Sequence, residues 1–237
     1  MNNRDRSAED SLLSRYSLIF KYQERERLDA NLKSLAKPIE AFRLMLDLRM
    51  LRRYLKGPKV LDFPLGSGRL YPLLIDEYEL YGFDISEFYV ERAQIRYPHL
   101  AERFRVNSFE SMEVPVMQFN SVYTMRVINQ INDRRFAVRN VARLLEPGGR
   151  WLVNLARSTF RDPVFSKSLE ENGFKVIALH PYDTYSSYGD MPPSINRIYG
   201  STVLRLVSMG LMPKWGFRVA DWLFARHGQY FMVAERQ

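Results

Sequence analysis

Two aspartates and the glycine-containing turn between them form the pattern in this chain that is best suited to chemistry. Asp62 lies in the apolar run Lys59–Phe63, and this run leads into a turn that contains Gly66 and Gly68. Asp84 ends the next apolar run, 22 residues after Asp62. Glycines at a strand-to-helix turn adopt positive φ angles and let a ligand touch the backbone. At this spacing the second carboxylate accepts both hydroxyls of a ribose lying across the strand ends, so the pattern predicts a nucleoside site.

Two classes of cofactor use such a turn. A dinucleotide-binding turn needs a third glycine so that the following helix can pack closely, and Leu70 and Tyr71 stand in that region here. Such a turn also seldom carries an acid within the first strand, where this chain has Asp62. These residues argue against a dinucleotide.

The turn resembles the first motif of the class I S-adenosylmethionine-dependent methyltransferases, in which an acid is followed by three spaced glycines. Asp62, Gly66 and Gly68 match that motif. Pro64 replaces the first glycine, and the turn ends in Gly68-Arg69, which is similar to a proline variant found in a subset of the family.

The resemblance continues beyond the turn, over residues 59–180. Residues 142–153 look like the family's turn into its fifth strand, and Phe119–Tyr123 looks like its fourth strand, with Asn120 where an acid is usual. The resemblance therefore covers about half of the chain and leaves both flanks outside it.

The resemblance implies S-adenosylmethionine as the cofactor and S-adenosylhomocysteine as the product. It places the ribose on Asp84, next to Ile85, and the adenine near Ser108 and Phe109. Ser108 stands where the family commonly has an aspartate, and a hydroxyl accepts a hydrogen bond from the adenine amino group less strongly than a carboxylate does. The other expected cofactor contacts, in the turn and around the methionine moiety, are Asp62, Pro64, Gly66, Gly68, Arg69 and Met125.

Short apolar runs alternate with helical patterns along the middle of the chain. The predicted strands are Lys59–Phe63, Glu79–Asp84, Phe104–Asn107, Ser121–Met125, Trp151–Ala156, Phe174–Leu179 and Tyr230–Ala234. The predicted helices are Pro38–Gly57, Leu70–Asp76, Glu87–Tyr97 and Asp133–Leu145. This alternation predicts an α/β fold with a doubly wound, seven-stranded, mostly parallel sheet, as in Rossmann-like methyltransferases.

The net charge of +8 lies entirely in the flanks of the chain. Residues 59–156 hold 12 basic and 12 acidic side chains. Residues 1–58 hold 13 basic and 8 acidic side chains, and residues 157–237 hold 10 basic and 7 acidic ones. We expect residues 1–58 to form an N-terminal helical cap and residues 59–237 to form the Rossmann-like methyltransferase domain. Residues 181–228 form an insertion between the last two predicted strands and are expected to act as a helical lid.

Few residues are available for acid–base or metal chemistry. The absence of cysteine excludes thiolate ligands and a cysteine nucleophile, and with only three histidines we expect no metal site. Methyl transfer from a sulfonium mainly requires alignment of the acceptor, and a base only where the acceptor must lose a proton. His180, after the sixth predicted strand, is the candidate base, with a structural role as the alternative. Asn129 is the candidate partner of the acceptor, with a place on a helix surface as the alternative.

The sequence as a whole predicts methylation of an oxygen atom on a small molecule or a glycan. An anionic acceptor would suit the basic flanks, and a nucleic-acid methyltransferase and an inactive cofactor-binding scaffold stay open as alternatives. Residues 215–226 have one apolar face, which suits lid packing or a homodimer seam, or contact with a membrane surface. The amino terminus lacks the apolar segment of a signal peptide, and no apolar run reaches the roughly 18 residues of a spanning helix, so a cytoplasmic location is expected.

Overall fold

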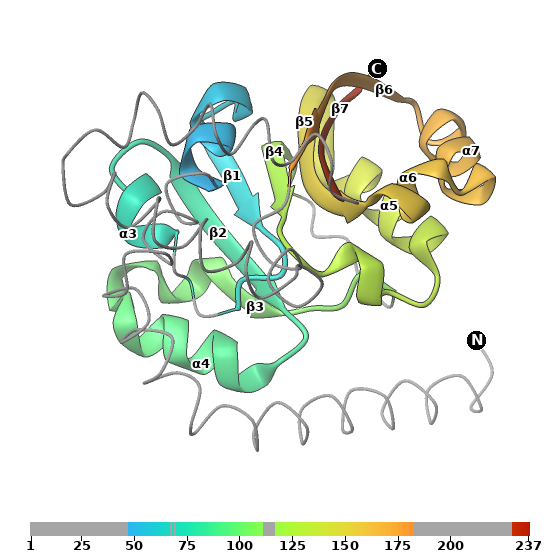
Figure 1. The fold of residues 1–237 in the computed structure, drawn as a ribbon. Helices are drawn as coiled ribbons and strands as arrows, with labels where there is room; N and C mark the ends of the chain where they lie inside the picture. Colours follow the sequence, from blue (N-terminus) through green and yellow to red (C-terminus); the bar gives the residue numbers. More distant parts are fainter. Residues whose placement is uncertain (1–46, 67, 69, 111–116, 183–228) are drawn as a thin grey trace, which may run out of the picture.

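Seven strands form one sheet in the order β3-β2-β1-β4-β5-β7-β6 (Figure 1). The computed structural model of the chain describes residues 47–66, 68, 70–110, 117–182 and 229–237. The strands are β1 (Lys59–Asp62), β2 (Glu79–Asp84), β3 (Phe104–Val106), β4 (Phe119–Thr124), β5 (Leu145–Ala156), β6 (Phe174–Pro181) and β7 (Gln229–Arg236). Neighbouring strands among β1 to β5 pair in parallel, and β7 pairs antiparallel with β5 and β6. The predicted mostly parallel sheet of seven strands is confirmed.

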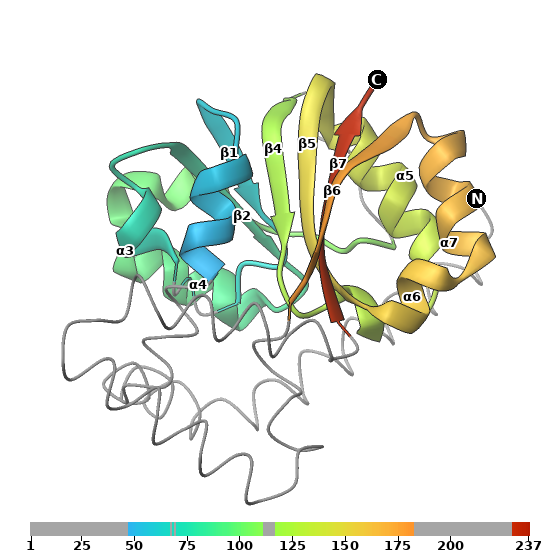
Figure 2. The same cartoon turned by 45° about the horizontal axis from the view of Figure 1, so that its top comes forward.

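Helices cover both faces of this sheet (Figure 2). Helical residues 47–54, α3 and α4 lie on one face, and α5, α6 and α7 lie on the other. The bounds are α3 (Tyr71–Leu74), α4 (Glu87–Arg96), α5 (Arg134–Leu144), α6 (Arg157–Arg161) and α7 (Pro163–Glu171), with short 3-10 helices η1 (Pro98–Arg103) and η2 (Ile128–Gln130). The sheet is therefore doubly wound, as predicted.

Local signals explain where the helices on the second face begin. The side chain of Asp133 caps α5 by accepting a hydrogen bond from the amide of Arg135 at 3.0 Å, and Asp162 caps α7 in the same way through Val164 at 3.0 Å. Both are aspartates at the N-cap position, where a side-chain oxygen satisfies an amide that has no partner within the helix. Helices α6 and α7 were not predicted from the sequence, although the Asp162 cap and Pro163 at the first helical position mark the start of α7.

Each face of the sheet has its own hydrophobic core. The core under helical residues 47–54, α3 and α4 contains Leu51, Leu74 and Tyr123, and the core under α5 and α7 contains Val138 and Phe165. All five side chains are almost completely buried. Burial on both faces explains why the central parallel strands read as continuous apolar runs in the sequence.

The ends of some elements differ from the prediction. β5 begins at Leu145 rather than at Trp151, because the chain pairs with β4 through an irregular start that includes Gly148, which has a φ of +76°. β6 includes Pro181, the first residue of the range predicted for the insertion. Most of the predicted cap and the rest of the predicted lid, residues 1–46 and 183–228, lie outside the described residues. Within the described part of the chain, no helix is long and apolar enough to cross a membrane.

Candidate functional site

The two aspartates selected from the sequence lie together at the carboxyl ends of adjacent strands. Asp62 ends β1 and Asp84 ends β2, and both residues are 4% exposed. Asp62 pairs in register with Gly82 of β2 on one side and with Tyr123 of β4 on the other. Because the strands run parallel, their carboxyl ends share one edge of the sheet, which is where open α/β sheets bind ligands.

The turn after β1 is held against this edge by its backbone. The amide of Phe63 donates to the carbonyl of Tyr123 at 3.0 Å, and the amide of Leu65 donates to the carbonyl of Phe83 at 2.8 Å. Gly66 and Gly68 adopt φ angles of +52° and +62°, in the left-handed region that glycine occupies at little cost. The positive φ angles expected from the sequence at these glycines are therefore present in the fold. Arg69, expected in the same turn, lies outside the described residues.

The carboxylate of Asp84 joins the turn to the end of β2. Its Oδ2 accepts a hydrogen bond from the amide of Gly66 at 2.8 Å, and its Oδ1 accepts one from the amide of Ser86 at 2.9 Å. Burial raises the pKa of the Asp84 carboxyl to about 6, although these amide hydrogen bonds oppose the rise. The side chain is therefore held in one orientation and ionises close to neutral pH.

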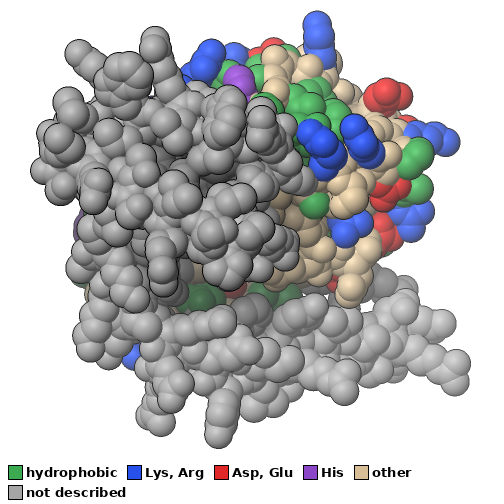
Figure 3. All heavy atoms as spheres, in the orientation of Figure 1, with side chains coloured by type: hydrophobic (Ala, Val, Ile, Leu, Met, Phe, Trp, Pro, Cys, Tyr) green, Lys and Arg blue, Asp and Glu red, His purple; other side chains and the backbone are tan. Residues whose placement is uncertain are grey.

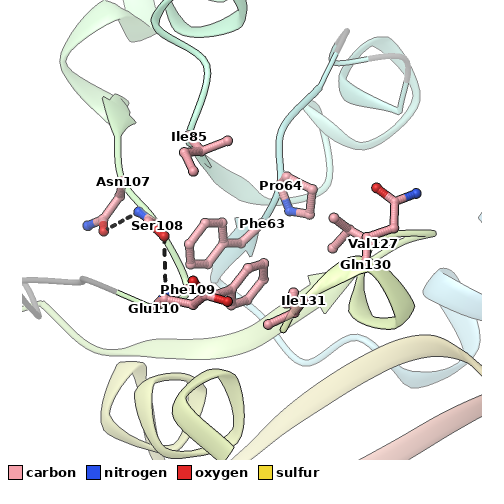
Figure 4. Close-up of a pocket in the computed structure, with 10 residues that line it drawn as sticks. All are labelled: Phe63, Pro64, Ile85, Asn107, Ser108, Phe109, Glu110, Val127, Gln130 and Ile131. Atoms are coloured by element: carbon pink, nitrogen blue, oxygen red, sulfur yellow. Dashed lines mark hydrogen bonds between the residues drawn. The ribbon is translucent and has the colours of Figure 1, made fainter. Parts of the chain in front are cut away.

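A pocket opens beside this edge, and two stacked aromatic rings form its floor (Figure 4). Phe63 follows β1 and Phe109 follows β3, and their ring centroids are 3.7 Å apart with an angle of 13° between the planes. The side chains around the pocket are mainly apolar, with Asn107, Ser108 and Glu110 on one side and Gln130 on the other, which suits a flat heterocycle with polar edges. The lining residues are Phe63, Pro64, Ile85, Asn107, Ser108, Phe109, Glu110, Val127, Gln130 and Ile131.

Four of these lining residues were expected from the sequence, namely Pro64, Ile85, Ser108 and Phe109. Sequence reasoning missed the other six. Phe63, Asn107 and Glu110 are immediate neighbours of expected residues, which was an available signal. Val127, Gln130 and Ile131 come from the segment after β4, and only the three-dimensional fold brings that segment to the pocket.

The polar groups at the pocket are ordered by local hydrogen bonds. The side-chain oxygen of Ser108 accepts from the amide of Glu110 at 3.2 Å, and the side-chain oxygen of Asn107 accepts from the amide of Ser108 at 2.7 Å. The carboxylate of Glu110 accepts from the amide of Asn132 at 3.2 Å. A serine oxygen has two lone pairs and its hydrogen can rotate, so Ser108 retains capacity for a further hydrogen bond.

The two candidate catalytic residues do not line this pocket. Asn129 lies in η2, and its side-chain oxygen accepts from the amide of Ala156 at 2.9 Å and from the hydroxyl of Thr159 at 3.0 Å. His180 lies in β6, where its Nε2 is 2.6 Å from the hydroxyl of Tyr54. Both side chains therefore have structural partners. Among the described residues, no group of three or more His, Cys, Asp or Glu side chains could hold a metal ion.

Comparison with known proteins shows what this sequence and fold are similar to. A family model described as "Methyltransferase domain" matches residues 61–153. The chain is 29% identical over 114 residues to an O-methyltransferase of Pyrenophora dematioidea, which covers 46% of this chain and 43% of that protein. It is 27% identical over 141 residues to the 27-O-demethylrifamycin SV methyltransferase of Amycolatopsis mediterranei, and this match covers 56% of this chain and 52% of that protein. The matches thus span about half the length of these curated relatives.

Solved structures share the fold at low sequence identity. A TehB-like S-adenosylmethionine-dependent methyltransferase of Corynebacterium glutamicum superposes with a TM-score of 0.57 at 15% identity, covering 90% of this chain and 97% of that chain. The glycopeptide N-methyltransferase MtfA, in complex with S-adenosylmethionine, superposes with a TM-score of 0.52 at 15% identity, covering 81% of this chain and 86% of that chain. The fold is that of a Rossmann-like methyltransferase domain. Residues 61–153 of this fold are thus similar in sequence to methyltransferase domains.

The contacts of Asn129 predict a loss of stability when its side chain is removed. Asn129→Ala leaves the Ala156 amide and the Thr159 hydroxyl without this acceptor, so the free energy of unfolding should fall by about 1–3 kcal/mol. Asn129→Asp keeps an acceptor oxygen at the same place and is the matched control, with a smaller expected loss. Urea unfolding followed by circular dichroism measures both. An Asn129→Ala variant as stable as the parent protein would contradict this structural role.

Proposed function

We propose that this protein transfers the methyl group of S-adenosylmethionine to an oxygen atom of a small molecule or a glycan. The observation that carries the proposal is the carboxylate of Asp84, which is buried at the end of β2 and accepts a hydrogen bond from the amide of Gly66 in the turn. It lies beside a pocket with an aromatic floor. The match of residues 61–153 to the methyltransferase-domain model supports the reaction class, and the curated relatives that carry O-methyltransferase names support oxygen as the target atom.

The residues at the edge of the sheet fit this cofactor. The Asp84 carboxylate has about four lone-pair sites, and backbone amides of Gly66, Ser86 and Ile85 act on it, so it retains capacity to accept from the ribose hydroxyls. Ile85 and Phe109 line the pocket next to Asp84 and would hold the adenine between apolar surfaces, with Ser108 at its polar edge. The methionine moiety would lie along Asp62 and the turn. The proposed contacts in that part of the site are Asp62, Pro64, Gly66, Gly68, Arg69 and Met125.

The chain's own residues would act mainly by alignment. Bound S-adenosylmethionine would supply a methyl group activated by a sulfonium, which an acceptor oxygen displaces with formation of S-adenosylhomocysteine. Asp84 would fix the nucleoside in one position, and the stacked Phe63 and Phe109 rings would exclude water from the base. Holding two reactants in line replaces a bimolecular encounter and can lower the barrier by several kcal/mol.

The proposed general base is His180, for an acceptor whose hydroxyl must lose a proton. β6 runs in the same direction as β5, so the end of β6 that carries His180 lies at the edge of the sheet where β1 and β4 also end. The hydroxyl of Tyr54 lies against Nε2 of His180 and would fix the ring orientation. Asn129 could contact an acceptor only through its amide N–H groups, because its oxygen accepts from Ala156 and Thr159.

The proposed setting of the reaction follows the charge distribution. We assign residues 1–58 and 181–228, which carry much of the basic excess, to a cap and a lid around the acceptor, and we propose a cytoplasmic location and an anionic acceptor. A nucleic-acid acceptor is less favoured. On the face shown in Figure 3, the Lys and Arg side chains of the described residues are interspersed with Asp and Glu rather than gathered in one stripe.

Cofactor binding is tested first by isothermal titration calorimetry. S-adenosylhomocysteine should bind in the micromolar range and NADH should give no heat. Asp84→Ala should weaken that binding by about 1–3 kcal/mol, because charge-assisted hydrogen bonds to the ribose are lost. Glu79→Ala, at the exposed start of the same strand, is the matched control and should bind like the parent protein. Binding of NADH in place of S-adenosylhomocysteine would overturn the proposed function.

The raised pKa of Asp84 predicts a pH dependence of cofactor affinity. The ionised carboxylate is the form that accepts both ribose hydroxyls, and protonation near pH 6 removes part of that capacity. Affinity should therefore stay level above about pH 7 and fall by up to about tenfold for each pH unit below the pKa. Calorimetry between pH 5 and pH 8 measures the profile. Asp84→Asn should bind weakly with a flat profile, and an unchanged slope in that variant would assign the titration to another group.

The acceptor is tested by transfer of a labelled methyl group. With methyl-labelled S-adenosylmethionine, label should enter hydroxylated small molecules, anionic ones above all, as an ether that resists mild base. Label entering RNA, together with RNA binding that falls steeply with salt, would favour the nucleic-acid alternative. Once an acceptor is known, His180→Ala should lower turnover, and unchanged turnover would remove His180 as the base.

A further inference from the structure

The segment that follows β4 turns sharply at Arg126. Its φ is +68°, and among the described residues it is the one residue other than glycine with a positive φ. An arginine in the left-handed region costs free energy, so its surroundings must hold it there. Such a backbone conformation, two residues after the end of a strand and beside a pocket, is a feature that functional sites often contain.

This turn decides which face of the sheet the next residues reach. Met125, before the turn, packs against the core under helical residues 47–54, α3 and α4. Val127 and Ile131, after the turn, pack against the opposite core under α5. A strand that continued straight would direct Met125 and Val127 to the same face, because side chains alternate with a period of two. The turn at Arg126 therefore brings Val127, Gln130 and Ile131 to the wall of the pocket (Figure 4).

A buried carboxylate from another part of the chain holds the Arg126 side chain. Nη2 of Arg126 donates to Oδ2 of Asp47 at 2.9 Å, and the hydroxyl of Tyr182 donates to Oδ1 of the same carboxylate. The Asp47 side chain is 0% exposed and that of Arg126 is 20% exposed. Removing one partner from a buried ion pair is costly because the other charge remains buried.

The two residues that hold this arginine are themselves anchored away from the pocket. Asp47 belongs to helical residues 47–54, in which Leu51 is completely buried in the core. Tyr182 directly follows β6, where its amide donates to the carbonyl of Gln229 at 3.0 Å and its ring lies 5.4 Å from that of Phe231. Neither lines the pocket.

We propose that Asp47 and Tyr182 are positioning residues for the methyl-transfer site: through Arg126 they fix the turn that brings Val127, Gln130 and Ile131 to the cofactor pocket. The inference rests on the proposed function where it names the cofactor. The positioning of the turn itself does not depend on which ligand binds.

The proposal is tested by comparing Asp47→Asn with Glu77→Gln. Each change turns an arginine-paired carboxylate into an amide, and each pair involves helical residues 47–54, but the Arg52–Glu77 pair is exposed. Hydrogen-exchange mass spectrometry without ligand should show faster exchange over residues 125–131 in Asp47→Asn and no change there in Glu77→Gln. Should Asp47→Asn fail to fold, Tyr182→Phe removes one hydroxyl and should give a smaller increase over the same residues.

Calorimetry measures the affinity for S-adenosylhomocysteine, which a loss of global stability alone would not change while the variant stays folded. At a temperature where all variants are folded, Asp47→Asn should weaken S-adenosylhomocysteine binding about tenfold, and Glu77→Gln should stay within about twofold of the parent protein. If the parent protein does not bind S-adenosylhomocysteine, the proposed function fails, while the exchange data still decide the positioning role.

Glycine at the turn provides the decisive comparison, because it adopts a positive φ without cost. In an Arg126→Gly background the turn no longer depends on Asp47. Adding Asp47→Asn relieves the carboxylate left buried without its arginine, and should therefore neither speed the exchange of residues 125–131 nor weaken the binding of S-adenosylhomocysteine. An effect of Asp47→Asn as large in this background as in the parent protein would overturn the proposal, and so would unchanged exchange in folded Asp47→Asn and Tyr182→Phe.

Discussion

The buried carboxylate of Asp84 is the interaction on which the arrangement of the site depends. It accepts amide hydrogen bonds from Gly66, in the turn after β1, and from Ser86, at the start of α4. One side chain thus joins two strand-to-helix connections that are separated in the sequence. Burial makes this costly, and the two amides offset part of the cost, because a buried carboxylate is tolerated only where its oxygens are hydrogen-bonded. The pKa of about 6 reflects the same balance.

Parallel strand pairing makes this arrangement possible. With β1, β2 and β4 adjacent and running in the same direction, the chain leaves the sheet three times at one edge. The turn at Arg126 adds a wall to the pocket at this edge, and the aromatic pair after β1 and β3 adds its floor. The site is therefore assembled from connections between elements, while the strands provide a fixed frame.

The sequence predicted those parts of the fold and site that depend on local patterns. Apolar runs gave all seven strands, and the spacing of Asp62 and Asp84 around the glycines indicated the edge where the pocket lies. It did not indicate Val127 or Gln130, whose proximity to the pocket depends on how the connection after β4 folds. The contact between Asp47 and Arg126 joins residues 79 positions apart. No local pattern encodes such a pairing, because a carboxylate in an amphipathic helix reads as a solvated group until the helix is packed.

Contacts made by helical residues 47–54 connect this helical segment to the carboxyl edge of the sheet, where the site lies. At the first of these described residues, Asp47 pairs with Arg126 at the carboxyl edge of the sheet. At and just after the last helical residue, Tyr54, the carbonyl of Tyr54 accepts a hydrogen bond from Arg150 at 3.1 Å, and Lys56 contacts Gly148 and Glu235. These contacts, with Leu51 buried between them, fix the position of residues 47–54 along the strands as well as their distance from them. These residues thus pack as part of the sheet's own core, although composition grouped them with the amino-terminal flank. A change in this helix would therefore reach the pocket through the backbone at Arg126, without touching any residue that lines it.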